Sequence, residues 1–218
     1  MDSKHKEFLG LLFREGRLYT QKAMKALDHD FPSSATGVIY PHGCYDIKQN
    51  IGYLNLGRSH DTSRFACDSL RFWWENYGRL AYPQARRLLV LCDGGGSNAS
   101  NRYVFKYHLE KLATRLGIEI RIAHYPPYCS KYNPIEHRVF SHVTRACQGL
   151  LLKSLEITCR AMARTSTKAG LKTVVNVLAS DYPLKEGYPD EYRSSMTIRF
   201  DESLPTWNYR AIPVKCDS

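Results

Sequence analysis

The sequence predicts an α/β domain in which a mixed β-sheet is flanked by helices. Three strand-like segments come first, at 8–13, 37–45 and 51–56, and the five residues between the last two suit an antiparallel hairpin. Segments with helical periodicity then alternate with apolar strand-like runs, which is typical of helices packed on a partly parallel sheet. The composition, 43% hydrophobic and 24% charged, is that of a globular chain.

The first half of the chain contains the predicted hairpin and one helix. The strand at 8–13 is expected to continue back to Asp2, and the polar stretch after it to form one helical turn at 22–27. His60-Asp-Thr-Ser63 offers N-cap side chains to a helix whose apolar face begins at Phe65.

The second half alternates more regularly. An apolar strand is predicted at 86–92, and it ends at Asp93, where a Gly-rich loop begins. A helix is expected at 101–116, stopped by a glycine, then a strand at 118–124 and a helix at 134–148 that opens with proline.

The residues after 150 are predicted to add a helix at 154–164, a strand at 171–178 and a polar tail. We therefore expect one main domain at 1–150 and an extension of it at 151–218.

The charge is unevenly distributed. The chain has 31 Lys and Arg against 21 Asp and Glu, and residues 101–180 hold 13 of the former and only 4 of the latter. A field of one sign confined to one stretch suits a polyanionic partner, although a solvated helical surface explains the asymmetry equally well.

Two classes of protein are excluded. No apolar run approaches the roughly 18 residues of a membrane span, so we expect no membrane association. The seven cysteines are scattered without a Cys-x-x-Cys pair, which favours free thiols in a reducing cytoplasm over a secreted disulfide scaffold.

Asp93 is the first candidate for chemistry. It closes an apolar strand and opens the loop Gly94-Gly-Gly-Ser-Asn98, and active sites of α/β sheets lie at the carboxyl ends of strands. Capping of the turn is the simpler alternative. A phosphate-binding loop is disfavoured because neither common nucleotide-binding glycine motif is present.

Glu136 is the second candidate. It falls three positions after Asn133, the reciprocal position of a helix capping box, with Pro134 at the first helical position. It also shares a helix face with four apolar residues: Val139, Phe140, Val143 and Cys147. A carboxylate on that face needs a compensating cation or donors, so capping and catalysis or metal binding remain equal alternatives.

Several nearby side chains are secondary candidates. Lys131, Arg138 and Arg145 flank Glu136 and could contact phosphate, or be ordinary solvated residues. Ser97 and Asn98 could hold the Asp93 loop through side-chain hydrogen bonds. The remaining candidates are four potential zinc ligands whose spacing matches no common zinc signature: His124, Cys129, His137 and His142.

Longer motifs carry a family resemblance over almost the whole chain. They occur in this order: Asp2-Ser-Lys-His-Lys-Glu-Phe-Leu-Gly10, Tyr40-Pro-His-Gly-Cys-Tyr-Asp46, His60-Asp-Thr62, Cys92-Asp-Gly-Gly-Gly-Ser-Asn98, His124-Tyr-Pro-Pro-Tyr-Cys-Ser-Lys-Tyr-Asn-Pro-Ile-Glu-His-Arg138 and Trp207-Asn-Tyr209. Together they resemble the Rhodopirellula-type DDE transposase domain of bacterial insertion sequences.

The resemblance implies a ribonuclease-H-like fold with a catalytic triad of Asp2, Asp93 and Glu136. It implies two Mg²⁺ ions, for which Mn²⁺ may substitute, held by these three carboxylates because Mg²⁺ prefers hard oxygen ligands. The matching motif gives His137 and Asn133 supporting roles. The expected partners are transposon-end and target DNA, with a possible homo-oligomer on DNA in the bacterial cytoplasm, bound to the nucleoid.

The resemblance implies DNA strand cleavage and transfer. The alternatives are a catalytically silent remnant that still binds DNA and a ribonuclease-H-like nuclease that never joins strands. Only Met1 precedes Asp2, so we expect a first strand shortened at the catalytic residue, with Asp2 loosely held on a fraying terminus. A truncated, frameshift-split or mis-started copy that folds but is inactive is the corresponding expectation.

Overall fold

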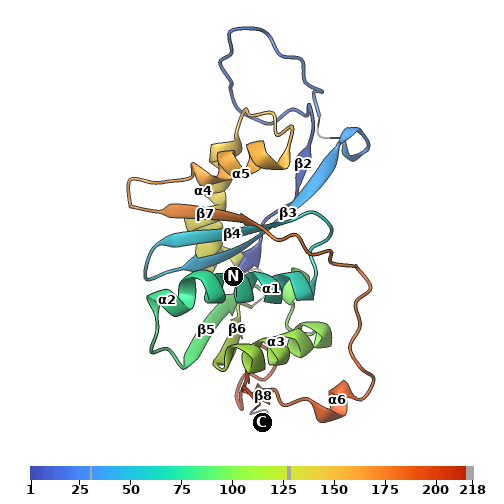
Figure 1. Ribbon diagram of the computed structural model, residues 1–218, viewed down its shortest axis with the longest axis vertical. Helices are drawn as coiled ribbons and strands as arrows, with labels where there is room; N and C mark the ends of the chain where they lie inside the picture. Colours follow the sequence, from blue (N-terminus) through green and yellow to red (C-terminus); the bar gives the residue numbers. More distant parts are fainter. Residues whose placement is uncertain (30, 127–128, 215–218) are drawn as a thin grey trace. The chain divides into compact units, whose positions relative to one another are not determined.

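The computed structural model describes residues 1–29, 31–126 and 129–214, without the side chain of residue 130. Its chain divides into two compact units (Figure 1). Unit 1 comprises Met1–Ser3, His60–Asn133 and Tyr182–Ser218, and unit 2 comprises Lys4–Ser59 and Pro134–Asp181. Both are mixed α/β structures, so the predicted fold class is confirmed at that level.

The sheet of unit 1 has the strand order β5-β6-β9-β8. Strands β5 (Arg87–Cys92) and β6 (Glu119–His124) are parallel, because a helix connects them. Strand β9 (Asn208–Ala211) is antiparallel to β6, and β8 (Arg199–Phe200) is antiparallel to β9. The short strand β1 (Asp2–Ser3) also belongs to this unit.

The first helix of unit 1 begins with the side-chain N-cap that the sequence predicts. In α1 (Ser63–Trp73), Thr62 is the N-cap, and its hydroxyl oxygen accepts a hydrogen bond from the backbone N–H of Phe65. The helix continues through a π-helical segment η2 (Trp74–Gly78) into α2 (Arg79–Ala81). Helix α3 (Tyr103–Leu116) packs against α1, and a short helix, α6 (Tyr192–Ser195), follows late in the chain.

Unit 2 is built on a sheet in which β2 (Glu7–Leu9) pairs with β3 (Gly37–Asp46), β3 with β4 (Ile51–Gly57), and β4 with β7 (Lys172–Val177). The first two pairings are antiparallel and the third is parallel. Figure 1 shows β7 running beside β4, although more than 100 residues separate the two strands in the sequence. The predicted hairpin of β3 and β4 is confirmed. A 3-10 turn occurs in unit 2 at Pro32–Ser34, and two occur in unit 1, at Gly96–Asn98 and Ser130–Tyr132.

The helices of unit 2 bury their apolar faces on this sheet. A π-helical segment η5 (Glu136–Phe140) leads into α4 (Ser141–Cys147), and α5 (Leu155–Ala163) follows with Ser154 as its N-cap. Val139, Val143 and Met162 are fully buried in one core with Leu54 and Leu56 of β4. The apolar stripe predicted for residues 136–147 is therefore confirmed for its four hydrophobic members.

Two glycines let the helix that carries Glu136 approach the sheet. A Cβ atom at Gly43 of β3 would lie 2.7 Å from side-chain atoms of Ile135 and Phe140, and one at Gly52 of β4 would lie 2.6 Å from Val139. These distances are too short for any real side chain, so the absence of a Cβ sets the depth at which the helix packs.

Three local predictions are wrong. The strand expected at 8–13 ends at Leu9, because Gly10 has φ +140° and donates its N–H to Leu152 instead of continuing the ladder. Lys22–Leu27 forms no helical turn; Leu27 instead exchanges backbone hydrogen bonds with Leu11 and Phe13. The tail expected to be merely polar contains β9, whose Tyr209 and Ala211 are buried.

The cysteines and the lengths of the helices were also predicted from the sequence. Six cysteines lie in the described part of the chain, and all six are free thiols, as predicted for them. Within that same part, no helix combines the length and the apolar character needed to cross a membrane.

Candidate active site around Asp2 and Asp93

Asp2 is buried and held at both carboxylate oxygens. Its side chain is only 6% exposed, its Oδ1 accepts the backbone N–H of Ser3 at 2.7 Å, and its Oδ2 accepts the side-chain amide of Asn133 at 2.7 Å. The amino group of Met1 donates to the carbonyl oxygen of Leu91 at 2.5 Å. The expectation of a loosely held Asp2 on a fraying terminus is therefore wrong, because buried polar contacts order these first residues.

Asp93 lies one residue beyond the end of β5, as the sequence predicts. Its Oδ1 accepts the backbone N–H of Gly95 at 3.2 Å, which is the turn-capping contact expected of an aspartate at this position. Burial raises the pKa of the thiol of Cys92, the last residue of β5, to about 11, and the carboxylates of Asp2 and Asp93 make smaller contributions in the same direction.

His124 fixes the backbone of Asp93. Its Nδ1 lies 2.8 Å from the carbonyl oxygen of Asp93, and its Nε2 lies 2.9 Å from the hydroxyl of Tyr209. A carbonyl oxygen only accepts, so Nδ1 carries the proton and the Tyr209 hydroxyl donates to Nε2. Burial lowers the pKa of His124, which keeps the ring neutral and preserves this arrangement.

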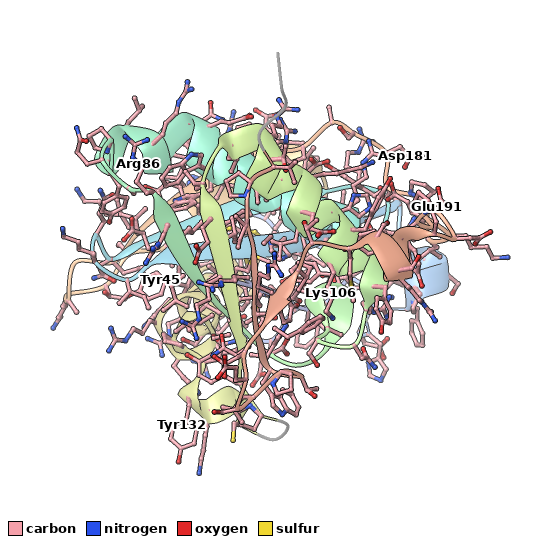
Figure 2. The ribbon with its side chains drawn as sticks, turned by 90° about the horizontal axis from the view of Figure 1, so that it is seen from below. Tyr45, Arg86, Lys106, Tyr132, Asp181 and Glu191 are labelled. Atoms are coloured by element: carbon pink, nitrogen blue, oxygen red, sulfur yellow. The ribbon has the colours of Figure 1, made fainter. Side chains whose placement is uncertain are left out.

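A buried lysine lies next to this pair. Lys106 on α3 (Figure 2) donates to the carbonyl oxygen of Ser100, and its ammonium group lies 4.7 Å from the centre of the Tyr209 ring. Burial lowers the pKa of Lys106 to about 8 and raises that of Tyr209. No sequence pattern pointed to Lys106, whereas Tyr209 lies in the motif Trp207-Asn-Tyr209 and His124 opens another motif.

The Gly-rich loop after Asp93 is anchored through Ser97. The Ser97 hydroxyl lies 3.3 Å from the Ser3 hydroxyl, and the Ser97 carbonyl accepts a hydrogen bond from Ser63 at 2.6 Å. Asn98 is 1% exposed, but neither polar atom of its side chain has a hydrogen-bond partner among the described residues. The loop is thus held through Ser97, and the side-chain hydrogen bond expected from Asn98 is not found.

A further carboxylate that the sequence did not single out lies beside this loop. Burial raises the pKa of Asp61, the side chains of Ser3 and Ser97 act to lower it, and the Asp93 carboxylate makes a smaller contribution that raises it. The only signal for Asp61 is its place in the short motif His60-Asp-Thr62.

Glu136 belongs to unit 2. It is partly buried at the start of the π-helical segment, on the helix whose next turns place Val139, Phe140 and Val143 in the core. Asn133, the predicted cap of this helix, is 1% exposed and donates its amide nitrogen to Asp2.

Comparison with known families decides where this arrangement belongs. The family described as the Rhodopirellula transposase DDE domain matches residues 1–213, which is almost the whole chain. The chain belongs to this transposase family. No curated protein and no solved structure gives a significant match.

The donor set of this transposase domain has the chemistry that a divalent metal requires. Asp2 contributes two carboxylate oxygens, each oriented by a hydrogen bond. Carboxylates are the hard ligands that Mg²⁺ and Mn²⁺ take. Among the described residues, no three His, Cys, Asp or Glu side chains converge into a complete metal cage.

Four of the remaining sequence candidates of the transposase domain are exposed. Lys131 is exposed, with its ammonium group 5.0 Å from the centre of the Tyr132 ring, and Arg138, Arg145 and His137 are exposed along the helix that carries Glu136. Of the four candidate zinc ligands, His124 is engaged at both ring nitrogens. Pro127 and Tyr128, in the centre of the longest motif, lie outside the described residues.

Proposed function

We propose that this chain is the catalytic domain of a DDE transposase with a ribonuclease-H-like fold, in which Asp2, Asp93 and Glu136 bind divalent metal ions for DNA strand cleavage and transfer. The observation that carries the proposal is the environment of Asp2. A surface aspartate without a role would be solvated, whereas Asp2 is 6% exposed and oriented by two hydrogen bonds.

The chemistry of the proposed reaction explains the residue types. When bound, a pair of divalent ions makes a hydroxyl nucleophilic and stabilises the departing 3′-oxygen of a phosphodiester. The protein contributes carboxylates of fixed position, because a small displacement of a catalytic group lowers the rate strongly. Asn133 and the Ser3 amide orient the Asp2 carboxylate, while His124 holds the Asp93 backbone.

The basic surface supports the choice of DNA as the substrate. Arg138 and Arg145 are seven positions apart and both exposed, so they lie on one helix face two turns from each other. Contacts of this kind would position the phosphate backbone without reading sequence. Lys131 is proposed as a further phosphate contact.

A strand-joining assay tests the proposal. Purified protein is incubated with labelled duplexes that carry the ends of the element encoding this chain, a supercoiled target plasmid, and either Mg²⁺ or Mn²⁺. The expected result is a joined product that disappears in Asp93→Asn and Glu136→Gln. Glu156→Gln is the matched control, since Glu156 is an exposed carboxylate on α5 that pairs with Arg160.

The two alternatives give different results in the same assay. Metal-dependent nicking without joined product would indicate a nuclease that does not transfer strands. Full binding of the end duplex, with neither nicking nor joining and with no Mn²⁺ bound in a calorimetric titration, would indicate a silent remnant. Joined product that persists in Asp93→Asn would remove Asp93 from the metal site.

A further inference from the structure

Strand β9 brings the motif Trp207-Asn-Tyr209 against the segment that carries Asp93. It pairs antiparallel with β6, the strand that ends at His124. The backbone N–H of His124 donates to the carbonyl oxygen of Trp207 at 2.7 Å, just beyond this ladder. The proposed triad gives this motif no role, although all of these contacts lie within unit 1.

Two consecutive hydrogen bonds connect Tyr209 to Asp93. The Tyr209 hydroxyl lies 2.9 Å from Nε2 of His124, and Nδ1 of the same ring lies 2.8 Å from the carbonyl oxygen of Asp93. Because a carbonyl oxygen only accepts, the ring donates from Nδ1, and the hydroxyl donates to Nε2. Tyr209 and His124 are 1% and 7% exposed, so bulk water cannot replace either partner at low cost.

The direction of the Tyr209 hydroxyl is set by contacts other than its hydrogen bond. The ammonium group of Lys106 lies 4.7 Å from the centre of the Tyr209 ring and is itself held by the carbonyl oxygen of Ser100. The rings of Tyr209 and His124 also pack on each other, with centres 5.5 Å apart and a tilt of 39°. A tyrosine fixed in this way can orient the imidazole rather than follow it.

Trp207 reaches the Asp93 loop by a second, independent contact. A Cβ atom added to Gly94, the residue after Asp93, would lie 3.2 Å from Cζ3 of the Trp207 ring and 3.3 Å from the carbonyl oxygen of Tyr125. Both distances are shorter than an ordinary van der Waals contact, so the ring packs closely on the Gly94 backbone. The motif therefore supports two consecutive residues, one through His124 and one directly.

We propose that Tyr209 is a positioning residue that orients the His124 ring and so fixes the backbone of Asp93 for divalent-metal binding. Trp207 supports the same loop by packing on Gly94. The inference rests on the proposed function, because it assumes that Asp93 binds the metal, and neither Tyr209 nor His124 is itself a ligand. Partners behind the ligands typically change metal affinity by about 10–100-fold when they are removed.

Mn²⁺ binding to the full chain without DNA, followed by electron paramagnetic resonance of the free ion, tests the inference. Tyr209→Phe keeps the buried ring and removes only the hydroxyl, and its Mn²⁺ Kd is expected to rise about tenfold. Tyr192→Phe is the matched control, since Tyr192 is a buried tyrosine of α6 in the same unit, outside this chain of hydrogen bonds. Its Kd should equal that of wild type.

Variants of His124 test the route of the effect. His124→Ala removes both ring hydrogen bonds and should raise the Kd by about 10–100-fold. His124→Asn places an amide N–H near the position of Nδ1, so it should recover most of that loss. Adding Tyr209→Phe to His124→Ala should change the Kd less than about twofold, because Tyr209 acts through the ring.

The metal-free protein provides two readouts that do not depend on the metal. In proton NMR, the Nδ1 proton of His124 should exchange slowly with solvent, and its signal is assigned by its absence in His124→Asn, since the chain has eight histidines. The signal should broaden in Tyr209→Phe and persist in Tyr192→Phe. Backbone hydrogen exchange in a peptide covering residues 92–98 should rise in the first variant and stay unchanged in the second.

Several results would overturn the inference. One is an unchanged Kd in Tyr209→Phe when wild-type protein binds Mn²⁺. Another is an additive effect of Tyr209→Phe in the His124→Ala background, which would exclude action through the ring. Equal Kd values in His124→Asn and His124→Ala would show that the Nδ1 donor has no role, and this comparison decides the matter if Tyr209→Phe does not fold.

Failure of the proposed function gives a different result. In that case wild-type protein binds no Mn²⁺, or binds it equally well after Asp93→Asn, and the inference falls with the proposed function. Binding that is lost in Asp93→Asn and unchanged in Tyr209→Phe would overturn the inference alone.

Discussion

Asn133 donates its side-chain amide to Oδ2 of Asp2 at 2.7 Å, across 131 positions of the sequence. Both side chains are buried, at 1% and 6% exposed, so neither group can replace this partner with bulk water at low cost. The bond connects the beginning of the chain to the residue just before the helix that carries Glu136. It therefore relates two motifs of the family whose connection could not be seen in the sequence.

We expect Asn133→Ala to destabilise the protein by about 1–3 kcal/mol, because it leaves a buried carboxylate oxygen without its donor. The free energy of unfolding in urea measures the change. Asn101→Ala is the control, since Asn101 is exposed in the same unit and should change stability by less than about 0.5 kcal/mol. Equal stabilities of Asn133→Ala and wild type would contradict the structure at this contact.

A second prediction concerns the packing of the Glu136 helix. Gly43→Ala and Gly52→Ala would each place a methyl group within 2.7 Å of core side chains of that helix, so the helix must move outward. We expect each to cost about 1–3 kcal/mol of stability through overpacking. Gly37→Ala on the same strand β3 is the control, because its Cβ would meet only Leu9 at an ordinary 3.5 Å. A thermal midpoint as high in Gly52→Ala as in Gly37→Ala would show that the helix is not seated on the glycines.

Local features of the fold were predictable because their causes are local. Thr62 and Ser154 cap the helices that follow them, and the apolar run before Asp93 forms strand β5, in which only Val90 and Cys92 are buried. The stripe through Val139 and Val143 was equally visible as helical periodicity. In each case the signal is a side chain acting on its own neighbours in the sequence.

The rest depends on contacts between distant segments. Tyr209 lies in a tail of low hydropathy, yet antiparallel pairing with β6 buries it against His124. Gly10 ends its strand because its N–H pairs with Leu152, far along the chain. Asp61 has no periodic or compositional signal, and Ser3 and Ser97, whose side chains act on its pKa, are 58 positions before it and 36 after it. Sequence motifs marked several of these residues without revealing what they touch.

A third prediction follows from His42, which is fully buried on β3 opposite the equally buried Asn55 of β4. Burial lowers the pKa of His42 from 6.5 to about 3. Between these two pH values the unfolded state binds more protons than the folded state, so stability is complete above pH 6.5 and is lost as the pH falls. The loss is about 1.4 kcal/mol per pH unit.

Urea unfolding between pH 7 and pH 4.5 measures this dependence. His42→Gln should have a shallower slope than wild type by about one proton, since it removes the titrating ring. His5→Gln should keep the wild-type slope, because His5 is exposed. Parallel slopes for wild type and His42→Gln would show that the ring does not titrate with folding.

The last prediction concerns how the basic surface would engage DNA. Residues 101–180 carry 13 Lys and Arg against 4 acids, and Arg138 and Arg145 are exposed on one helix face within that window. If these side chains neutralise phosphates, the logarithm of the DNA Kd rises linearly with the logarithm of the salt concentration, and each lost contact reduces the slope by about 1.

Fluorescence anisotropy at about 50–300 mM salt measures this slope. We expect Arg138→Ala and Arg145→Ala each to reduce it by about 1. Arg160→Ala should leave the slope nearly unchanged, because the Arg160 guanidinium is already paired with Glu156 at 2.5 Å. A DNA affinity independent of salt, or an equal reduction in all three variants, would place the phosphate contacts elsewhere on the protein.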